Sequence, residues 1–514
     1  MDDEVNNMRA SGILMPVFSL PTKYGIGTLG KEAYDFVRFL KKAGQRYWQL
    51  LPLNPTNYGD SPYQSFSAAA GNPYFIDLEL LTKEGLLTPP DYAGVDFGDD
   101  PGAVDYAKLY DNRLPVLRRA YARFAGGETF DAFCREQADW LEDYALFMAL
   151  KDACGGVSWR EWEPALQRRE PAALAAFRRA HAEDIRFYQF LQFQFSNQWE
   201  ALKRYANDNG VYIIGDMPIY VADDSADVWA NPGQFDLDED LQPRVVAGCP
   251  PDAFSADGQL WGMPVYNWDA MAAEQPSYGW WRRRMRRAFA LYDVVRIDHF
   301  RGFEAYYCIP QGAKNAKKGA WRKGPGMALF RALREEFGET LPIIAEDLGM
   351  LTEEVHQLLA DTGFPGMKVL QFAFSAGEES TYLPHHYTRN AVVYTGTHDN
   401  DTIMGWTTSA APADVDFARR YLHVDNREGF NWAMIRAAMM SVADTAIFMM
   451  ADFMGLGSEA RINTPSTVGG NWRWRIGEGC INDWLAGIIR ENTALYCRLP
   501  KPAPDAISTK KSPG

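Results

Sequence analysis

Short apolar runs alternate with longer amphipathic stretches along most of this 514-residue chain. The apolar runs end in Pro, Gly, Asn or Asp, and this alternation is typical of the β–α repeat of a parallel sheet. Several runs are apolar throughout, as expected of strands that are buried on both faces. The predicted strands span residues 12–20, 47–53, 211–220, 293–300, 342–348, 367–374, 391–400 and 445–456. Eight parallel strands can close a barrel without leaving an edge, so the pattern predicts an α/β fold of the (β/α)8 TIM-barrel type.

The rhythm is interrupted between the second and third predicted strands by a segment far too long for a simple crossover. Residues 80–207 within it are expected to form a mostly helical insertion subdomain, because apolar residues recur there at helical spacing. Residues 222–281 are rich in Pro, Gly, Asp and Trp and are expected to form loops and short helices, a lid over the C-terminal barrel face. The polar tail 502–514 is expected to be disordered. Residues 1–514 would then form a single (β/α)8 unit with two insertions.

The charge of the chain restricts the partners that it can bind. The formal net charge is −15 at pH 7, and an acidic surface of this size repels nucleic acid and anionic lipid. Neutral ligands such as sugars meet no such repulsion. The 16 Trp and 25 Tyr residues suit sugars, because aromatic faces stack on the C–H faces of pyranose rings. Most of these aromatic residues are nevertheless expected to serve packing in the core and between elements.

The cysteines and the first residues indicate a cytoplasmic protein. Six cysteines are scattered with no CxxC pair, which in a chain of this length indicates reduced thiols. The opening segment MDDEVNNMRA is acidic and polar, unlike a secretory or transit peptide. No apolar run approaches the roughly 18 residues that a membrane span requires. We therefore expect a soluble, cytoplasmic protein that binds neither nucleic acid nor membrane, and the sequence does not determine its oligomeric state.

A glycine-rich motif near the start resembles part of a dinucleotide site, but the acidic residue that such a site also requires is missing. Residues 25–30 match G-x-G-x-x-G, follow a predicted strand and precede a predicted helix. A dinucleotide site also requires an acidic residue at the end of the next strand, roughly 20 residues farther on. That strand ends at Asn54 with no acidic residue. A tight β–α turn is therefore the better interpretation.

Acidic residues lie at or near the carboxyl ends of five of the predicted strands. They are Asp216, Asp298, Glu346 with Asp347, Asp399 with Asp401, and Asp452. A buried carboxylate is costly unless it is paired or used. Any one of these residues could be a helix N-cap or an ion-pair partner. Because the carboxyl ends of barrel strands surround the active site, five acidic strand ends together predict that these side chains line one pocket.

The residues around these acids indicate how the acids could work. Arg296 and Asp298 lie two apart on one strand and share a face, so the guanidinium is expected to hold the carboxylate ionised, as a nucleophile requires. Glu346 follows an apolar run, which is expected to raise its pKa and suits a general acid. Such a pair performs retaining glycoside chemistry when about 5 Å separates the carboxyl groups. His398 and Asp399 could hydrogen-bond sugar hydroxyls, although His398 could also be a satisfied core histidine.

Other classes of catalytic site find little support. The sequence contains no HExxH, no His-x-His, no P-loop and no GxSxG, and the adjacent His385 and His386 do not have the spacing of a typical metal site. A Ca²⁺ or Mg²⁺ site built from the strand-end carboxylates stays open as an alternative, although no motif requires one. The sequence therefore predicts neither a metal nor a cofactor.

Several sequence blocks resemble the signature blocks of a known family. Three of them carry strand-end acids: VRIDHFRG (295–302), AEDLG (345–349) and THDNDT (397–402). Further blocks are YGDSPY (58–63), GDMPIY (215–220), ADVWANP (226–232), GQLWG (258–262) and RINTP (461–465). Together they resemble amylomaltases, also called disproportionating enzymes, which are the 4-α-glucanotransferases related to α-amylases. The blocks occur in the family's order over nearly the whole chain.

The resemblance implies an activity and a role for each of three acids. Asp298 would be the nucleophile that forms a covalent glucosyl-enzyme, and Glu346, rather than Asp347, the general acid/base. Asp399 would stabilise the distorted sugar of the transition state. The implied enzyme transfers α-1,4-glucan segments between maltooligosaccharides and other α-1,4-glucans by a retaining double displacement. It would need no cofactor and no metal.

The resemblance also implies a set of substrate contacts. They are Arg296, His398, Asp216, His299, Asp252, Phe254, Trp261, Asn463, Tyr63, Tyr58 and Tyr106. Asp252 and Phe254 match the loop that covers the cleft in this family. Tyr58 and Tyr106 match aromatic residues that the family uses for a second, remote glucan contact, and Trp261 matches a residue that lines the cleft.

Two positions depart from the family pattern, and two other functions stay open. Ala253 stands where the lid motif usually carries Tyr, and Ala69 replaces a usual Phe. The change at Ala253 removes an aromatic platform near the acceptor path and so affects the ratio of transfer to hydrolysis. The alternatives are an α-glucan hydrolase, with water as the acceptor, and a glucan-binding protein without activity. Incubation with maltotriose separates the three, and the presence of all three acids favours an enzyme.

Overall fold

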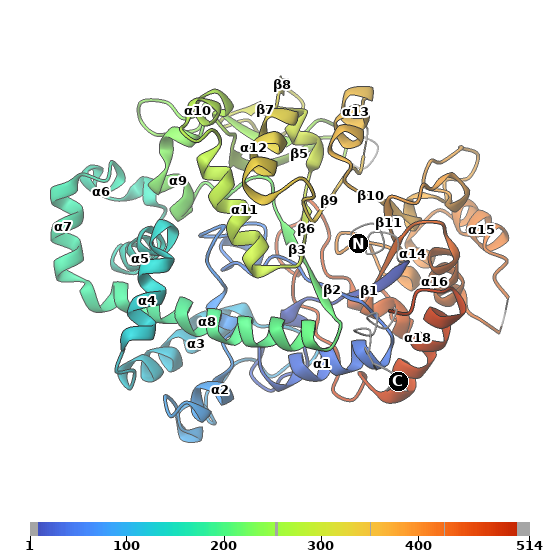
Figure 1. Cartoon of the computed structure of the whole chain (residues 1–514), viewed down its shortest axis with the longest axis horizontal. Helices are drawn as coiled ribbons and strands as arrows, with labels where there is room; N and C mark the ends of the chain where they lie inside the picture. Colours follow the sequence, from blue (N-terminus) through green and yellow to red (C-terminus); the bar gives the residue numbers. More distant parts are fainter. Residues whose placement is uncertain (1–8, 252–254, 350, 426, 501–514) are drawn as a thin grey trace, which may run out of the picture.

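The computed structural model describes residues 9–251, 255–349, 351–425 and 427–500, apart from the side chain of Tyr58 (Figure 1). The predicted disordered tail 502–514 and part of the predicted lid, residues 252–254, lie outside the described residues. No helix in the described part of the chain has the length and apolar character needed to cross a membrane.

Eight parallel strands form the central sheet, in the order β10-β11-β12-β1-β2-β3-β6-β9. Their bounds are β1 Ala10–Leu14, β2 Tyr47–Gln49, β3 Tyr212–Met217, β6 Val294–Ile297, β9 Ile343–Ala345, β10 Gly366–Val369, β11 Ala391–Tyr394 and β12 Thr445–Met449. The two outer strands meet where the amide of Ala345 donates to the carbonyl of Pro365 at 3.0 Å. Each strand lies within or beside a predicted apolar run, and the TIM-barrel prediction is confirmed.

The strands are shorter than the apolar runs that predicted them. The first run was expected to continue to residue 20, but β1 ends at Leu14. Pro16 follows, which has no amide hydrogen to extend the ladder, and Val17–Ser19 form a 3-10 turn. The apolar residues beyond the strands form other structures, such as the 3-10 turns Val17–Ser19 and Leu370–Phe372 and the short helix Met450–Met454.

Helices cover the outside of the sheet (Figure 1). Those that alternate with the barrel strands are α1 Lys31–Lys42, α11 Gly279–Leu291, α12 Met327–Phe337, α13 Glu353–Thr362, α14 Ile403–Ser409, α15 Pro412–Tyr421, α16 Phe430–Met440, α17 Met450–Met454 and α18 Asp483–Leu495. The helices between β2 and β3 are α2 Leu78–Lys83, α3 Tyr106–Ala122, α4 Glu128–Glu136, α5 Ala138–Ala153, α6 Pro164–Gln167, α7 Pro171–Ala180 and α8 Ala182–Asp208. The 27-residue helix α8 connects the outlying helices to the barrel, where Trp199 donates to the carbonyl of Leu291 at 3.0 Å.

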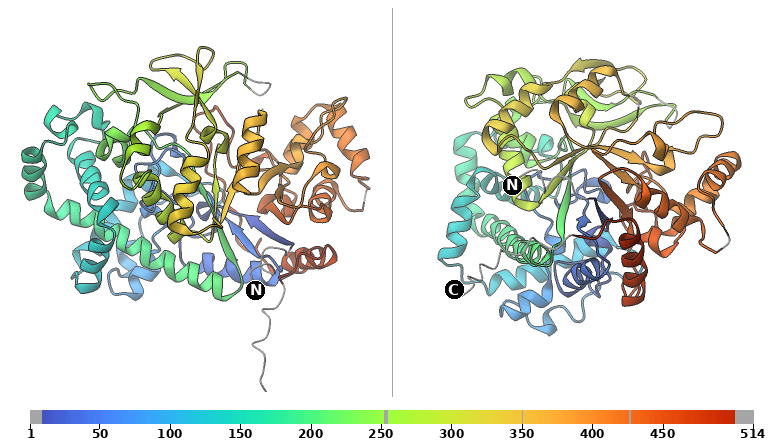
Figure 2. Two further views of the ribbon diagram at one scale, coloured as in Figure 1. Left: turned by 45° about the horizontal axis from the view of Figure 1, so that its top comes forward. Right: turned by 45° about the vertical axis from the view of Figure 1, so that its right-hand side comes forward.

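A second, antiparallel sheet lies above the barrel and was not predicted. Its order is β5-β4-β7-β8, with β4 Val245–Cys249, β5 Gln259–Pro264, β7 Ala305–Pro310 and β8 Ala320–Lys323 (Figure 2, left, at the top). Residues 222–281 were expected to contain loops and short helices. They do contain α9 Ala226–Ala230 and α10 Trp268–Ala273, but also the strands β4 and β5. β4 pairs with the nearby β5 on one side and with β7 on the other, and β7 lies after β6, so a local pattern could not indicate the whole sheet.

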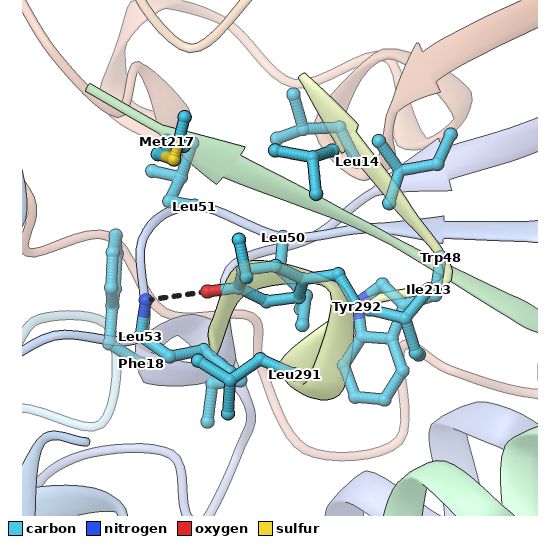
Figure 3. Close-up of a cluster of buried hydrophobic side chains, with 14 of the residues drawn as sticks. Leu14, Phe18, Trp48, Leu50, Leu51, Leu53, Ile213, Met217, Leu291 and Tyr292 are labelled. Carbon is cyan, nitrogen blue, oxygen red and sulfur yellow. Dashed lines mark hydrogen bonds between the residues drawn. The ribbon is translucent and has the colours of Figure 1, made fainter. Parts of the chain in front are cut away.

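The core beneath the barrel strands depends on one glycine. Tyr292 packs among Leu14, Trp48 and other apolar side chains, and its hydroxyl accepts from the amide of Leu53 at 3.4 Å (Figure 3). A Cβ atom on Gly215 in β3 would overlap the Tyr292 ring. The glycine therefore lets a large aromatic ring pack directly against the strand that ends in Asp216.

The glycine-rich segment 25–30 packs against protein groups. A Cβ atom on Gly27 would overlap the carbonyl of Val17, and one on Gly30 would overlap the carboxylate of Asp77. Asp77 accepts from the hydroxyl of Thr28 at 2.7 Å and caps α2. This close packing agrees with a tight β–α turn and leaves no cradle for a pyrophosphate.

One buried arginine ties the end of the chain to the start of the barrel. The side chain of Arg498 is fully buried and donates to the carbonyl oxygens of Ala10 at 2.9 Å, Met439 at 2.8 Å and Ala443 at 2.9 Å. Burial lowers the pKa of Arg498 to about 9. The guanidinium therefore satisfies backbone carbonyls at the start of β1, at the end of the helix Phe430–Met440 and in the loop that follows it.

We predict that Arg498→Met lowers the free energy of unfolding by about 3 kcal/mol, because several buried carbonyl oxygens lose their donors. Urea denaturation followed by circular dichroism would measure the change. Arg420→Met is the control, because the Arg420 ion pair with Asp416 is exposed and should contribute less than about 1 kcal/mol. Equal effects of the two substitutions would contradict the prediction.

Candidate active site

The carboxyl ends of β3 and β6 place a buried guanidinium between two carboxylates. Asp216 and Arg296 are partners in the ladder between these strands, so their side chains share a face. Arg296 Nη1 donates to both carboxylate oxygens of Asp216, at 2.7 and 2.8 Å, and Nη2 lies 3.0 Å from Asp298 Oδ1. Arg296 and Asp216 are 3% and 2% exposed, so this contact is shielded from water and rigid.

Glu346 lies on the next strand of the barrel, at the level of Asp298. The last ladder pair of β6 and β9 is Ile297 with Ala345, and each acid follows its strand by one residue. Glu346 Oε2 accepts from the amide of His299 at 2.6 Å, and Oε1 accepts from the amide of Leu348 at 2.7 Å. His299 has a left-handed φ of 52°, which turns the chain directly after Asp298 and aims its amide at Glu346. The two acids are thus neighbours held by backbone.

Burial changes the protonation of both acids. It raises the pKa of Glu346 to about 8, and the negative charge of Asp298 adds to this effect, against Arg296 and two amide donors. Burial also raises the pKa of Asp298 above its ordinary value, although Arg296 acts in the opposite direction. The expectation that Arg296 would hold Asp298 ionised was therefore incomplete, because the guanidinium also compensates Asp216. The direct contact of Arg296 with Asp298 favours a negative charge on Asp298 over one on Glu346.

The loop after β11 brings His398 and Asp399 to the same end of the barrel. The Tyr63 ring stacks on His398 with centroids 5.1 Å apart and 19° between the planes, and its hydroxyl donates to Asp216 Oδ2 at 2.8 Å. His398 Nε2 lies 3.4 Å from Asp399 Oδ1, which also accepts from Asn463 Nδ2 at 2.6 Å. The Asp399 side chain is 46% exposed, so it stays open to the cleft while one oxygen is held.

Two residues that support this loop had no role in the sequence analysis. Arg461 Nη2 donates to the carbonyl of Asp399 at 2.8 Å. The buried Trp472, with a left-handed φ of 62°, lies 5.6 Å from the Tyr63 ring and 5.9 Å from His398. No local pattern around Trp472 indicates this position, because the stack forms from three distant segments.

Trp261 lies on β5, in the sheet above the barrel. Its ring meets His299 edge to face with centroids 4.8 Å apart, and so flanks the turn that holds Glu346. Burial lowers the pKa of His299 to about 3, so this imidazole is neutral. The antiparallel sheet thus supplies an aromatic wall beside the acid pair.

The remaining predicted contacts have different positions. Tyr106 is 8% exposed and its hydroxyl donates to the carbonyl of Trp472 at 2.9 Å, which does not favour an open glucan platform there. Asp252 and Phe254, like the departure at Ala253, lie outside the described residues. Tyr58 belongs to a short 3-10 turn, and its side chain is also outside the description.

The strand-end acids were expected to line one pocket together, but three of them do not. Asp347 is 5% exposed and accepts from the amide of Met367 at 2.6 Å, on the outer side of β9. Asp401 is 7% exposed and accepts from the hydroxyl of Ser458 at 2.7 Å. These acids hold adjacent segments together. Asp347 directly follows Glu346 at one strand end, and alternation places the two side chains on opposite sides. Asp401 lies beyond the end of β11, where its hydrogen bond with Ser458 rather than strand alternation sets its position.

Asp452 is fully buried and joins both ends of the segment that carries His398 and Asp399. Its Oδ2 accepts from the hydroxyl of Thr395 at 2.7 Å, and its Oδ1 accepts from the amide of Ile403 at 2.8 Å. Burial raises the pKa of Asp452 from 3.8 to about 7. Asp452 therefore positions the Asp399 segment from behind.

Within the described ranges, no three His, Cys, Asp or Glu side chains are arranged to hold a metal ion. The negative charges of the acids at the carboxyl ends of the strands are instead compensated by Arg296 and by backbone amides. In (β/α)8 barrel enzymes the active site lies at the carboxyl ends of the strands. The ionisable groups that converge there in this protein therefore define it as an enzyme of this class.

Comparison with known proteins identifies the family. Residues 15–479 match the family model described as 4-alpha-glucanotransferase, and the chain belongs to this family. It is 48% identical over 488 residues to the 4-alpha-glucanotransferase of Clostridium butyricum, covering 94% of this chain and 100% of the relative. It is 50% identical over 481 residues to that of Thermus thermophilus, covering 91% and 95%. A solved amylomaltase from Streptococcus agalactiae in complex with acarbose is 44% identical, with a TM-score of 0.93 over 96% of this chain and 100% of that one.

We predict that the effect of Asp452→Asn on stability depends on pH. The folded pKa of about 7 lies above the ordinary 3.8, so the stabilising contribution of Asp452 is complete below about pH 4 and is lost as the pH rises through about 7. The variant should therefore be less stable than the parent at pH 5, and equally stable or more stable at pH 8. Urea denaturation at the two pH values measures this, with Asp361→Asn, an exposed position on α13, as the control. The same difference at both pH values would refute it.

Proposed function

We propose that this 4-α-glucanotransferase transfers α-1,4-glucan segments through a covalent intermediate on Asp298, with Glu346 as general acid and base. The observation that carries the proposal is the neighbouring pair itself. Asp298 is oriented by Arg296 at 3.0 Å, and Glu346 has a pKa raised to about 8. One acid is thus ionised and the other protonated near neutral pH, which is the division of roles that retaining chemistry needs.

In the first step, a carboxylate oxygen of Asp298 attacks the anomeric carbon of the donor glucan. The Arg296 contact occupies Asp298 Oδ1 and leaves Oδ2 for the attack. The bond between the anomeric carbon and the glycosidic oxygen breaks, and Glu346 gives its proton to that oxygen. The products are a glucosyl ester on Asp298 and a shortened glucan with a free 4-hydroxyl group.

In the second step, the 4-hydroxyl group of another glucan attacks the same carbon. The now ionised Glu346 takes the hydroxyl proton, the ester bond to Asp298 breaks, and a new α-1,4 bond forms. Two inversions at one carbon retain the α configuration. Both residues return to their starting protonation states, so the cycle needs no cofactor.

The other polar residues have supporting roles in this proposal. The exposed oxygen of Asp399 binds donor hydroxyls whose hydrogen bonds strengthen in the transition state, while Asn463 and His398 fix its orientation. Asp216 has both oxygens occupied by Arg296 and Tyr63. We therefore assign Asp216 to positioning Arg296, rather than to direct contact with the sugar that the resemblance implied.

Water competes with the acceptor for the intermediate, so the cleft has to exclude it. Trp261, on the antiparallel sheet, is suited to this because its ring packs against His299 beside Glu346. We propose that residues 222–281 act as the lid and that residues 80–207 form a helical insertion that supports it. We also propose a cytoplasmic location, in keeping with six cysteines that are all free thiols.

We predict that Asp298→Asn lowers the transfer rate by several orders of magnitude and changes maltotriose binding little, because the amide keeps the shape of the carboxylate and loses its nucleophilicity. The parent enzyme should convert maltotriose to glucose and a ladder of longer maltodextrins, measured by chromatography. Near-normal turnover of Asp298→Asn would refute the assignment. Products that are all shorter than maltotriose would indicate hydrolysis instead.

We predict that kcat/KM falls as the pH rises through about 8, where Glu346 loses the proton that it donates to the leaving group. Glu346→Gln should lower the rate on maltotriose about a thousandfold and abolish this alkaline limb. The same variant should keep much more activity on α-maltosyl fluoride, because fluoride leaves without protonation. Equal losses on both donors would exclude the role of general acid.

A further inference from the structure

A cavity lies outside the barrel mouth, lined by residues of α5, α9 and α11. Figure 1 shows where these helices lie. Its volume is about 330 Å³, and its lining includes the loop segment Ser67–Ala69. Part of the wall consists of small side chains, among them Ala69, Ala230 and Ala290. The volume is at the lower end of that of small-molecule sites and accommodates one or two pyranose rings.

A buried guanidinium faces this cavity with an unused donor. Arg287 lines the cavity, its Nε donates to the carbonyl of Ala69 at 3.0 Å, and its guanidinium lies 5.0 Å from the centre of the Trp140 ring. Its Nη2 is buried and has no hydrogen-bond partner. An unmet donor of this kind is unfavourable in the free protein, and a small rotation of the Arg287 side chain toward the cavity would let an oxygen of a bound ligand satisfy it.

The charges around the cavity favour a neutral ligand with many hydroxyl groups. Four arginines and five acidic residues are among its described lining residues. Two of the arginines are already engaged, since Arg284 donates to the carbonyl of Ile219 at 2.7 Å and Arg286 pairs with Glu336. The carboxylates would repel a phosphate, whereas sugar hydroxyls can donate to carboxylates and accept from Arg287. Trp140 adds an aromatic surface suited to a sugar ring.

We propose that this cavity is a second binding site for a short stretch of α-1,4-glucan, with Arg287 and Trp140 as its main contacts. The inference rests on the glucan substrates of the family and not on the roles of the three catalytic acids. The site is linked to the cleft through the loop that leads from Tyr63 to Ala69, so a chain bound here would hold long glucans near the barrel mouth.

Calorimetric titration of full-length Asp298→Asn protein with maltoheptaose tests the proposal. Two sites are expected, and adding Ala69→Phe, which fills the cavity, should weaken the second site at least tenfold. Ala176→Phe, the same change at an exposed position of α7, is the matched control and should keep both sites. Arg287→Lys, which retains the charge and removes Nη2, should also weaken the second site. In the parent background, Ala69→Phe should leave maltotriose transfer within about twofold.

Several outcomes would overturn the second site. They are a single site in the Asp298→Asn protein or two unchanged sites after Ala69→Phe. A third is found by titrating the same protein with inorganic phosphate: binding that Ala69→Phe removes would show that the cavity is an anion site. Failure of the proposed catalytic role is distinguishable, because turnover by Asp298→Asn would appear as a product ladder in the same sample. The number of sites would then be measured with Glu346→Gln instead.

Discussion

The buried guanidinium of Arg296 connects the fold of this enzyme to its chemistry. One terminal nitrogen binds both oxygens of Asp216, and the other holds Asp298 at 3.0 Å. Because Arg296 and Asp216 are buried, the cation is needed to compensate Asp216, and it also holds the partly exposed Asp298 beside Glu346. Tyr63 joins the same network through Asp216. Removing the cation would leave several acids buried without compensation, so catalysis and stability depend on the same contact.

Around Arg296, the barrel strands position the reacting acids, and the loops and the antiparallel sheet supply the other residues of the site. The strand ends supply Asp298 and Glu346 in the register that the parallel ladder between β6 and β9 sets. Asp399 instead depends on loops, through Asn463 at its side chain and Asp452 behind its segment. Trp261 comes from the antiparallel sheet above. Regular backbone thus positions the reacting pair, while loop contacts shape the surface that binds sugar.

Much of the fold and the centre of the site could be predicted from the sequence. The apolar runs located all eight barrel strands, because strands buried on both faces have a local signature. The antiparallel sheet was missed, since β4 pairs with β7 across a long stretch of chain. The sequence indicated that Arg296 favours an ionised Asp298, but not that burial opposes this by raising the pKa of Asp298 or that Arg296 is shared with Asp216. Asp452 was expected in the pocket and is fully buried behind it.

The sequence by itself determined the barrel, the strand ends that carry acids, and a family resemblance that the comparisons confirm. These features are local, since each depends on residue types within one short run. Only the tertiary structure decided which acids meet, because neighbours such as Glu346 and Asp347 point to opposite sides of one strand end. It also decided how strongly burial shifts their protonation, and that Trp472 closes the stack behind His398. Burial and ring stacking depend on contacts among segments that are far apart in the sequence, so no single short stretch of the chain can reveal them.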